Sequence, residues 1–291
     1  MRIGRILAVA GVSLATLVAG VTVASAQAAP VAAAPPGIDD FRGIIKLDNC
    51  SASLVKFRDA SADNAALMLT NGHCFEGGMP KAGQVFVNKA STRSGTLLKA
   101  DGSSAGTVKA DKALYVTMTD TDVSLYRLTT TYKAIQDKYG IAPIVLAEQG
   151  PKTGDKITVN SGYWTQRWHC SMDGQVYRLK EDQWTWKDSI RYSENCDTPH
   201  GSSGSPLLSD VTGEVVGINN TGNDDGAKCT MNNPCEVDQA GKITVLKKRS
   251  YAEQTWWFTG CKNAKAELDL TVAGCQLPKP TRTGYPHRPH H

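Results

Sequence analysis

Short apolar runs, separated by clusters of Gly, Asp, Asn and Ser, recur along most of this chain of 291 residues. Runs of this length between turn residues are typical of β-strands, and helical periodicity is sparse before the C-terminal region. Strands are predicted over residues 43–47, 53–57, 66–70, 84–88, 123–128, 156–161, 175–179, 189–192 and 214–219. Many short strands with turn signals between them predict an all-β sandwich or barrel.

The first 26 residues are typical of an export signal. Arg2 and Arg5 precede an apolar run over residues 6–23, and Ala24-Ser25-Ala26 has the small-x-small pattern that signal peptidase cleaves. A membrane anchor is the alternative, because the run is close to spanning length. Its richness in Ala, Gly, Ser and Thr favours the cleaved signal. The sequence therefore predicts a secreted, extracellular protein that has no membrane attachment after cleavage.

The rest of the chain divides by composition. Residues 27–42 are rich in Ala and Pro and predict a spacer or a pro-segment. Residues 43–277 predict one large β unit built of two lobes, over about 43–135 and 136–260, with the polar stretch 129–142 as their connection. Residues 278–291 are rich in Pro, His and Arg and predict a disordered tail.

The charge balance excludes few partners. The net charge is +4 and becomes +2 when Arg2 and Arg5 leave with the signal. No dense Lys/Arg patch with interleaved aromatic residues appears, which argues against a nucleic-acid partner. Nothing in the sequence demands a cofactor or a metal, and a monomer is expected.

The cysteines predict disulfides. There are eight, an even count in an exported chain: Cys50, Cys74, Cys170, Cys196, Cys229, Cys235, Cys261 and Cys275. Zinc is the alternative. However, Cys229-x5-Cys235 is wider than the tight pair that zinc sites favour, and no His lies beside it.

Three segments carry residues suited to nucleophilic catalysis, in the order His, Asp, Ser. An apolar strand ends at Asn71-Gly72-His73-Cys74, Asp122 opens an alternating apolar strand, and Gly201-Ser202-Ser203-Gly204-Ser205-Pro206 places a serine between glycines. A serine hydroxyl needs an adjacent base to become nucleophilic, and His suits that role because its pKa lies near working pH. A carboxylate then holds the imidazole in the correct tautomer.

These segments resemble the Ala-Ala-His-Cys, Asp-Ile-Ala-Leu and Gly-Asp-Ser-Gly-Gly-Pro motifs of trypsin-like serine proteases, in the chymotrypsin-type order. The Gly-x-Ser-Gly-Ser-Pro form is more similar to bacterial glutamyl endopeptidases. The resemblance extends from about residue 43 to about residue 258. It implies an all-β fold of two antiparallel six-stranded barrels with a short C-terminal helical segment, and a serine endopeptidase acting on protein or peptide substrates.

The resemblance also implies a role for each residue. His73 is expected to be the base, Asp122 its orienting acid and Ser203 the nucleophile, with the N–H groups of Gly201 and Ser203 as the oxyanion hole. Asp120 competes with Asp122 for the acid, and Ser202 and Ser205 compete with Ser203 for the nucleophile. The position before the nucleophile is Asp in trypsins, where it pairs with the newly cut N-terminus. Since it is Ser202 here, that zymogen switch is missing.

The substrate pocket remains open between two interpretations. Asp197, six positions before Ser203, falls where trypsins keep a pocket-floor carboxylate, which implies a preference for Arg or Lys. Glutamyl endopeptidases also carry Asp-Thr here without that preference, but their later pocket histidine is replaced by Asn219. His200 either lines the cleft rim or is a plain turn residue. Asn220 and Gly222 complete the expected pocket.

The resemblance pairs Cys50 with Cys74. A bridge between Cys229 and Cys235 fits their short loop, which leaves Cys170 with Cys196 and Cys261 with Cys275, but sequence alone leaves this connectivity open. The tryptophans predict core packing in preference to a sugar-binding face. The alternative function is a catalytically inactive protease-fold binding protein. An α/β-hydrolase esterase is disfavoured because its Gly-x-Ser-x-Gly elbow and Ser, Asp, His order are missing.

Overall fold

The computed structural model describes Met1 and residues 38–281. The predicted signal over 1–26, most of the predicted spacer, and residues 282–291 of the predicted tail lie outside the described residues. Within the described part, no helix is long and apolar enough to cross a membrane.

The first barrel is a ring of six strands. In order around the ring these are β1 (Ile44–Lys46), β5 (Ser94–Leu98), β6 (Ser104–Thr117), β7 (Val123–Thr131), β3 (Ala65–Thr70) and β2 (Ser51–Lys56), and pairing of β1 with β2 closes the circle. Two further strands lie off the ring, β4 (Val85–Ala90) on β6 and β8 (Ile144–Val145) parallel to β2. The apolar run of β2 is buried along nearly its whole length, because a small barrel fills its interior with side chains.

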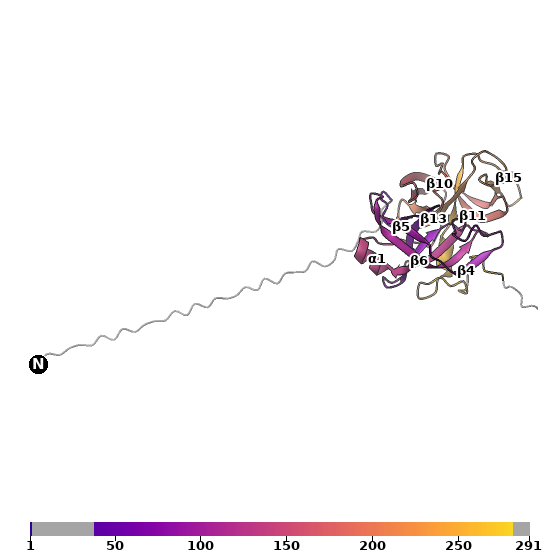
Figure 1. The fold of residues 1–291 in the computed structure, drawn as a ribbon. Helices are drawn as coiled ribbons and strands as arrows, with labels where there is room; N and C mark the ends of the chain where they lie inside the picture. Colours follow the sequence, from indigo (N-terminus) through magenta and orange to yellow (C-terminus); the bar gives the residue numbers. More distant parts are fainter. Residues whose placement is uncertain (2–37, 282–291) are drawn as a thin grey trace, which may run out of the picture. The chain divides into compact units, whose positions relative to one another are not determined.

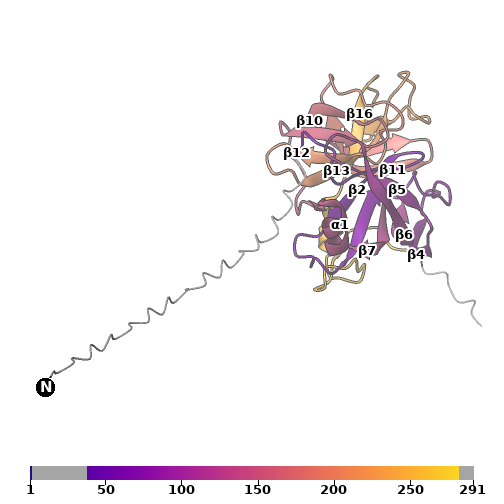
Figure 2. The same cartoon turned by 60° about the vertical axis from the view of Figure 1, so that its left-hand side comes forward.

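The second barrel is a matching ring. Its strands are β11 (Trp184–Tyr192), β16 (Ser250–Gln254), β13 (Val215–Gly222), β12 (Pro206–Ser209), β9 (Lys156–Ser161) and β10 (Gln166–Glu181), closed by pairing of β10 with β11. The short strands β14 (Cys235–Val237) and β15 (Ile243–Thr244) extend the sheet beyond β10. Figures 1 and 2 show the two barrels side by side. The predicted all-β fold of two six-stranded antiparallel barrels is confirmed.

Short helical segments connect and brace the barrels. The polar connector contains α1 (Tyr132–Tyr139), which begins after Thr131, whose side chain accepts a hydrogen bond from the N–H of Ala134. After β16, the 3₁₀-helix η1 (Trp256–Cys261) returns to the first barrel, where the ring of Phe258 packs edge-on against Tyr115 with 6.0 Å between centroids. The segment after β16 therefore stabilises the first barrel.

Several strands carry too little apolar patterning to be predicted. No predicted strand includes any residue of β5, β6 or β16. The first half of β6, residues 104–110, carries Gly, Lys and Thr, and several of these residues are exposed. β16 is fully buried although it reads Ser-Tyr-Ala-Glu-Gln, since its polar side chains have hydrogen-bond partners inside the second barrel. Strand formation there depends on tertiary contacts.

All eight cysteines form disulfides: Cys50–Cys74, Cys170–Cys196, Cys229–Cys235 and Cys261–Cys275. The predicted disulfides are confirmed, and the connectivity that the sequence left open is settled. Cys50–Cys74 lies in the first barrel, Cys170–Cys196 and Cys229–Cys235 lie in the second, and Cys261–Cys275 lies in the segment after β16. None of the four joins the two barrels.

Loop length predicts how much two of these bridges stabilise the fold. Cys170–Cys196 spans 26 positions and Cys229–Cys235 spans 6. Because a longer closed loop restricts the unfolded chain more, replacing the first pair by Ala should lower the free energy of unfolding by about 1 kcal/mol more than replacing the second. Urea unfolding of the two double variants measures the difference. Equal losses, or a larger loss for the short loop, would contradict this entropic account.

Candidate active site

A cleft with a volume of about 460 Å³ is lined by residues of both barrels. The first barrel contributes His73, which follows β3, and Asp122, which precedes β7. The second contributes Ser203, on the turn before β12. Three residues that are far apart in the sequence thus line one cavity.

His73 and Asp122 form a tight pair. The Nδ1 atom of His73 lies 2.8 Å from Oδ2 of Asp122, and the main-chain N–H of His73 donates to Oδ1 over 2.9 Å. The Asp122 side chain is fully buried and that of His73 is 23% exposed. Burial alone would lower the pKa of His73, but the charge and hydrogen bond of Asp122, with the charge of Glu181, together raise it above 6.5.

Asp120, the competing acid, is engaged elsewhere. Its carboxylate pairs with Lys187 and its carbonyl accepts the main-chain N–H of Lys187 over 2.8 Å. It therefore joins β11 of the second barrel to the loop before β7. Only Asp122 contacts the imidazole.

The serine turn depends on the two glycines that flank it. Gly201 and Gly204 have φ values of +88° and +78°, a region that side chains rarely adopt. A Cβ atom at Gly204 would lie 2.1 Å from the carbonyl oxygen of Ser51. Ser51 comes this close because its N–H donates to the carbonyl of Ser203 over 2.7 Å. Glycine is thus required where the turn meets the first barrel.

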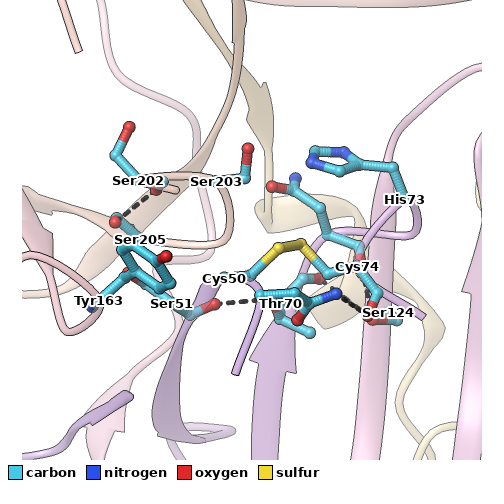
Figure 3. The surroundings of a disulfide bond; sticks show 12 residues. Cys50, Ser51, Thr70, His73, Cys74, Ser124, Tyr163, Ser202, Ser203 and Ser205 are labelled. Carbon is cyan, nitrogen blue, oxygen red and sulfur yellow. Dashed lines mark hydrogen bonds between the residues drawn. A yellow bond between two sulfur atoms is a disulfide. The ribbon is translucent and has the colours of Figure 1, made fainter. Parts of the chain in front are cut away.

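Ser203 points its hydroxyl into the cleft and donates to the carbonyl of Asn220 over 3.2 Å. Figure 3 shows Ser203 and His73 on opposite sides of the space above the Cys50–Cys74 disulfide. No hydrogen bond joins Ser203 to His73 among the described residues, so rotation of the hydroxyl must precede proton transfer. The competing Ser202 and Ser205 are buried, and their hydroxyls donate to the carbonyls of Pro199 and Ser202.

Two backbone donors face the nucleophile region without acceptors. Within residues 38–281, neither the N–H of Gly201 nor that of Ser203 donates a hydrogen bond, although their neighbours Ser202 and Gly204 both do. The pair can stabilise an oxyanion.

The structure does not bring the expected pocket residues together. Asp197 is exposed and lines a separate hollow with Pro199 and Lys248, so it supplies no buried pocket floor. Asn219 is buried, and its amide is used internally, accepting from Tyr192 and Thr198 and donating to Ser202. Both acceptor positions of its oxygen and one of its two amide N–H donors are therefore used inside the protein.

The remaining expected residues divide between the cleft and its rim. His200 lines the cleft, and its Nε2 lies 2.7 Å from Asp224. Asn220 also lines the cleft, with its carbonyl on Ser203 and its side chain donating 3.0 Å to Glu253. Gly222 lies further along β13 beside Ser250, outside the cleft lining.

Two buried carboxyl groups next to the cleft were not predicted. Glu253 on β16 is fully buried and accepts from Ser189 and Asn220, each over 3.0 Å. Burial raises the pKa of Glu253 well above 4.5, the hydrogen bonds from Asn220 and Ser189 oppose that rise, and the charge of Asp122 adds to it. The raised pKa favours the neutral form of Glu253 in the folded protein. Glu181 lies in the cleft wall and is 5% exposed. Neither has a sequence signal, because each lies in a strand without a clear apolar pattern.

The site has no donor set for a metal. The one group of potential ligands within residues 38–281 is His73 with Cys50 and Cys74. Both sulfurs are oxidised in one disulfide and offer no thiolate.

The sequence model of the trypsin-like peptidase domain matches residues 51–218. No curated protein sequence matches the chain. Among solved structures, the active form of the Rv3671c protease of M. tuberculosis is 15% identical, with 89% of this chain and 97% of that chain covered and a TM-score of 0.44. The MamO protease domain of Magnetospirillum magneticum is 12% identical, with 74% and 93% covered and a TM-score of 0.43.

A neutral Glu253 predicts a pH-dependent effect on stability. In the unfolded chain this carboxyl loses its proton near its ordinary pKa of 4.5, whereas the folded protein retains it to higher pH. The folded state thus binds more protons, and the free energy of unfolding falls as pH rises, by at most about 1.4 kcal/mol per unit. Glu253→Gln cannot ionise, so its stability relative to wild type should increase from about pH 5 to about pH 8.

Urea unfolding of both proteins across this range measures the effect. Glu148→Gln is the matched control, because the side chain of Glu148 is 56% exposed. Parallel pH curves for wild type and Glu253→Gln would show that Glu253 is ionised in the folded protein.

Proposed function

This chain belongs to the family of trypsin-like peptidase domains, and from that premise we propose that it is a secreted serine endopeptidase. Ser203 is its nucleophile, His73 its base and Asp122 the acid that orients the base. The observation that carries the proposal is the pairing of His73 Nδ1 with the buried Asp122, 2.8 Å apart, in the cleft that also holds Ser203.

Each step uses a group of this site. Ser203 Oγ attacks the carbonyl carbon of the scissile peptide while its proton passes to Nε2 of His73. Asp122, hydrogen-bonded to Nδ1, stabilises the imidazolium that forms. The imidazolium gives the proton to the leaving amine, which departs and leaves an acyl-enzyme on Ser203. A water molecule, deprotonated by His73, then hydrolyses the ester and restores the serine.

The oxyanion of the tetrahedral intermediate is bound by the N–H groups of Gly201 and Ser203. Both are without an acceptor in the described part of the chain, so they are ready for a new one. Such preorganised donors stabilise the charge that develops in the transition state, and each contributes roughly 2.7–4 kcal/mol.

Export and family branch extend the proposal. The signal-like segment over residues 1–26 and four disulfides support secretion, because disulfides persist in oxidising compartments. The Gly-x-Ser-Gly-Ser-Pro sequence over 201–206 supports a place near the bacterial glutamyl endopeptidases. Substrates are proteins or peptides, and the enzyme acts as a monomer.

An inactive protease-fold binding protein is the rival. A complete set of triad residues, with the acid and base already paired, favours the enzyme. A fluorophosphonate probe separates the two, because it reacts covalently only with an activated serine.

We predict that wild-type protein is labelled by the probe and that Ser203→Ala is not. The reason is that the hydroxyl of Ser203 alone faces the cleft, and peptide hydrolysis by Ser203→Ala should fall by about a million-fold. Mass spectrometry should map the adduct to Ser203. An adduct on Ser202 or Ser205, or no labelling of wild type, would reject the assignment.

Asp122→Asn should lower turnover by about 10,000-fold, because an amide holds the imidazole in the wrong tautomer. Asp120→Asn is the matched control: it removes a partly exposed ion pair with Lys187, worth roughly 0–1 kcal/mol, and should leave turnover nearly unchanged. Steady-state kinetics on one peptide compares the two. The opposite ranking would transfer the role to Asp120.

A further inference from the structure

Glu181 places a buried carboxylate in the wall of the catalytic cleft. It is the last residue of β10, directly across the β10–β11 hairpin from Trp184, and it is 5% exposed while the turn residues Asp182 and Gln183 are exposed. It lines the same cavity as His73 and Ser203. Its charge is one of the contributions that raise the pKa of His73.

Two donors hold the carboxylate in place. The hydroxyl of Thr221 donates to Oε2 over 2.6 Å, and the main-chain N–H of Asn232 donates to Oε1 over 2.8 Å. Asn232 belongs to the loop closed by Cys229–Cys235, and the carbonyl of Cys229 also accepts the N–H of Asp182. The short disulfide loop therefore fixes the end of the hairpin and aims Glu181.

The carboxylate has no cationic partner. Within residues 38–281, none of the Lys or Arg side chains forms an ion pair with Glu181. Each of its oxygens accepts one hydrogen bond and can accept another. Burial and the charge of Asp122 raise the pKa of Glu181, which disfavours its charged form, and a cation that enters the cleft would favour that form again.

The surrounding wall suits an alkyl chain. Trp184 and Trp186 are buried in the lining and are held by their indole N–H groups, which donate to the carbonyls of Pro80 and Met118. Met79 and Met231 line the same space and are 44% and 43% exposed. Aromatic and thioether surfaces next to a carboxylate match a side chain with an apolar stem and a cationic end.

We infer that Glu181 is the specificity-determining residue of the cleft and binds a Lys or Arg side chain of the peptide substrate beside the scissile bond. The inference rests on the proposed endopeptidase function. The preference for Arg or Lys that the sequence implied for Asp197 is thereby assigned to Glu181. The charge of Asp122, in the same cleft, adds to the attraction for a cation and opposes binding of acidic side chains.

The test uses a set of polyalanine peptides with blocked termini, each with a single Lys at a different position. Each peptide is compared with the same peptide in which that Lys is Nε-acetylated. Acetylation removes the charge and keeps most of the alkyl stem. Wild type should cleave the Lys peptide about 10- to 100-fold faster, in kcat/KM, than its acetylated partner at one position. Glu181→Gln should reduce that ratio to about one, and Asp197→Ser should retain it.

A second readout separates specific binding from a structural effect. Asp122 and Glu181 are the charged groups that raise the pKa of His73. Since His73 must be neutral to act as a base, removing the charge of Glu181 should move the acid limb of kcat/KM on an acetylated peptide to lower pH. Should Glu181→Gln fold poorly, Glu181→Asp retains the charge and should retain the ratio in part.

Failure of this inference is distinguishable from failure of the proposed function. The same peptide pairs are tested for binding to Ser203→Ala, with and without Glu181→Gln, by tryptophan fluorescence, which requires no catalysis. Tighter binding of the Lys peptide, lost in the double variant, supports Glu181 even if wild type takes up no fluorophosphonate. An unchanged Lys ratio in Glu181→Gln, its loss in Asp197→Ser, or equal binding of Lys and acetyl-lysine peptides would overturn it.

Discussion

The geometry of the active site depends on one contact, between the main chain of Ser51 and the turn at Ser203 and Gly204. The N–H of Ser51 donates to the carbonyl of Ser203, and the carbonyl of Ser51 accepts the hydroxyl of Thr70 and lies against Gly204. Ser51 begins β2 of the first barrel and follows Cys50, which is bridged to Cys74 beside His73. Ser203 of one barrel is thereby positioned against His73 of the other.

A second set of contacts closes the opposite side of the cleft. The β10–β11 hairpin contacts the first barrel through an ion pair between Lys187 and Asp120. The indole N–H groups of Trp184 and Trp186 also donate to the carbonyls of Pro80 and Met118. These contacts fix the wall that carries Glu181, just as Ser51 fixes the wall that carries Ser203. Because no disulfide joins the barrels, their relative position depends on such hydrogen bonds and on the buried apolar contacts between them.

Three carboxyl groups around one cleft have different states because their surroundings differ. Asp122 is paired with His73 and receives the main-chain N–H of the same residue. Glu253 has only neutral donors and is fully buried, and its raised pKa favours the protonated form. Glu181 lies in the cleft wall with two neutral donors and forms no ion pair with a Lys or Arg of the described residues, and we propose that a cationic side chain of the substrate is its partner.

The amino-acid sequence by itself determined the fold class, the strands with clear apolar runs and the three catalytic motifs. These features are local: an apolar run between turn residues forms a strand, and a serine between glycines forms an exposed turn, whatever lies nearby. Tertiary structure decided which acid pairs with His73, that β16 is a buried strand despite its polar residues, that Asp197 lies outside the cleft, and that Glu181 lies within it. Those outcomes depend on desolvation and on partners from distant segments. The local sequence pattern predicts neither the desolvation nor the partners, because the burial of a carboxyl group is a property of the assembled barrels.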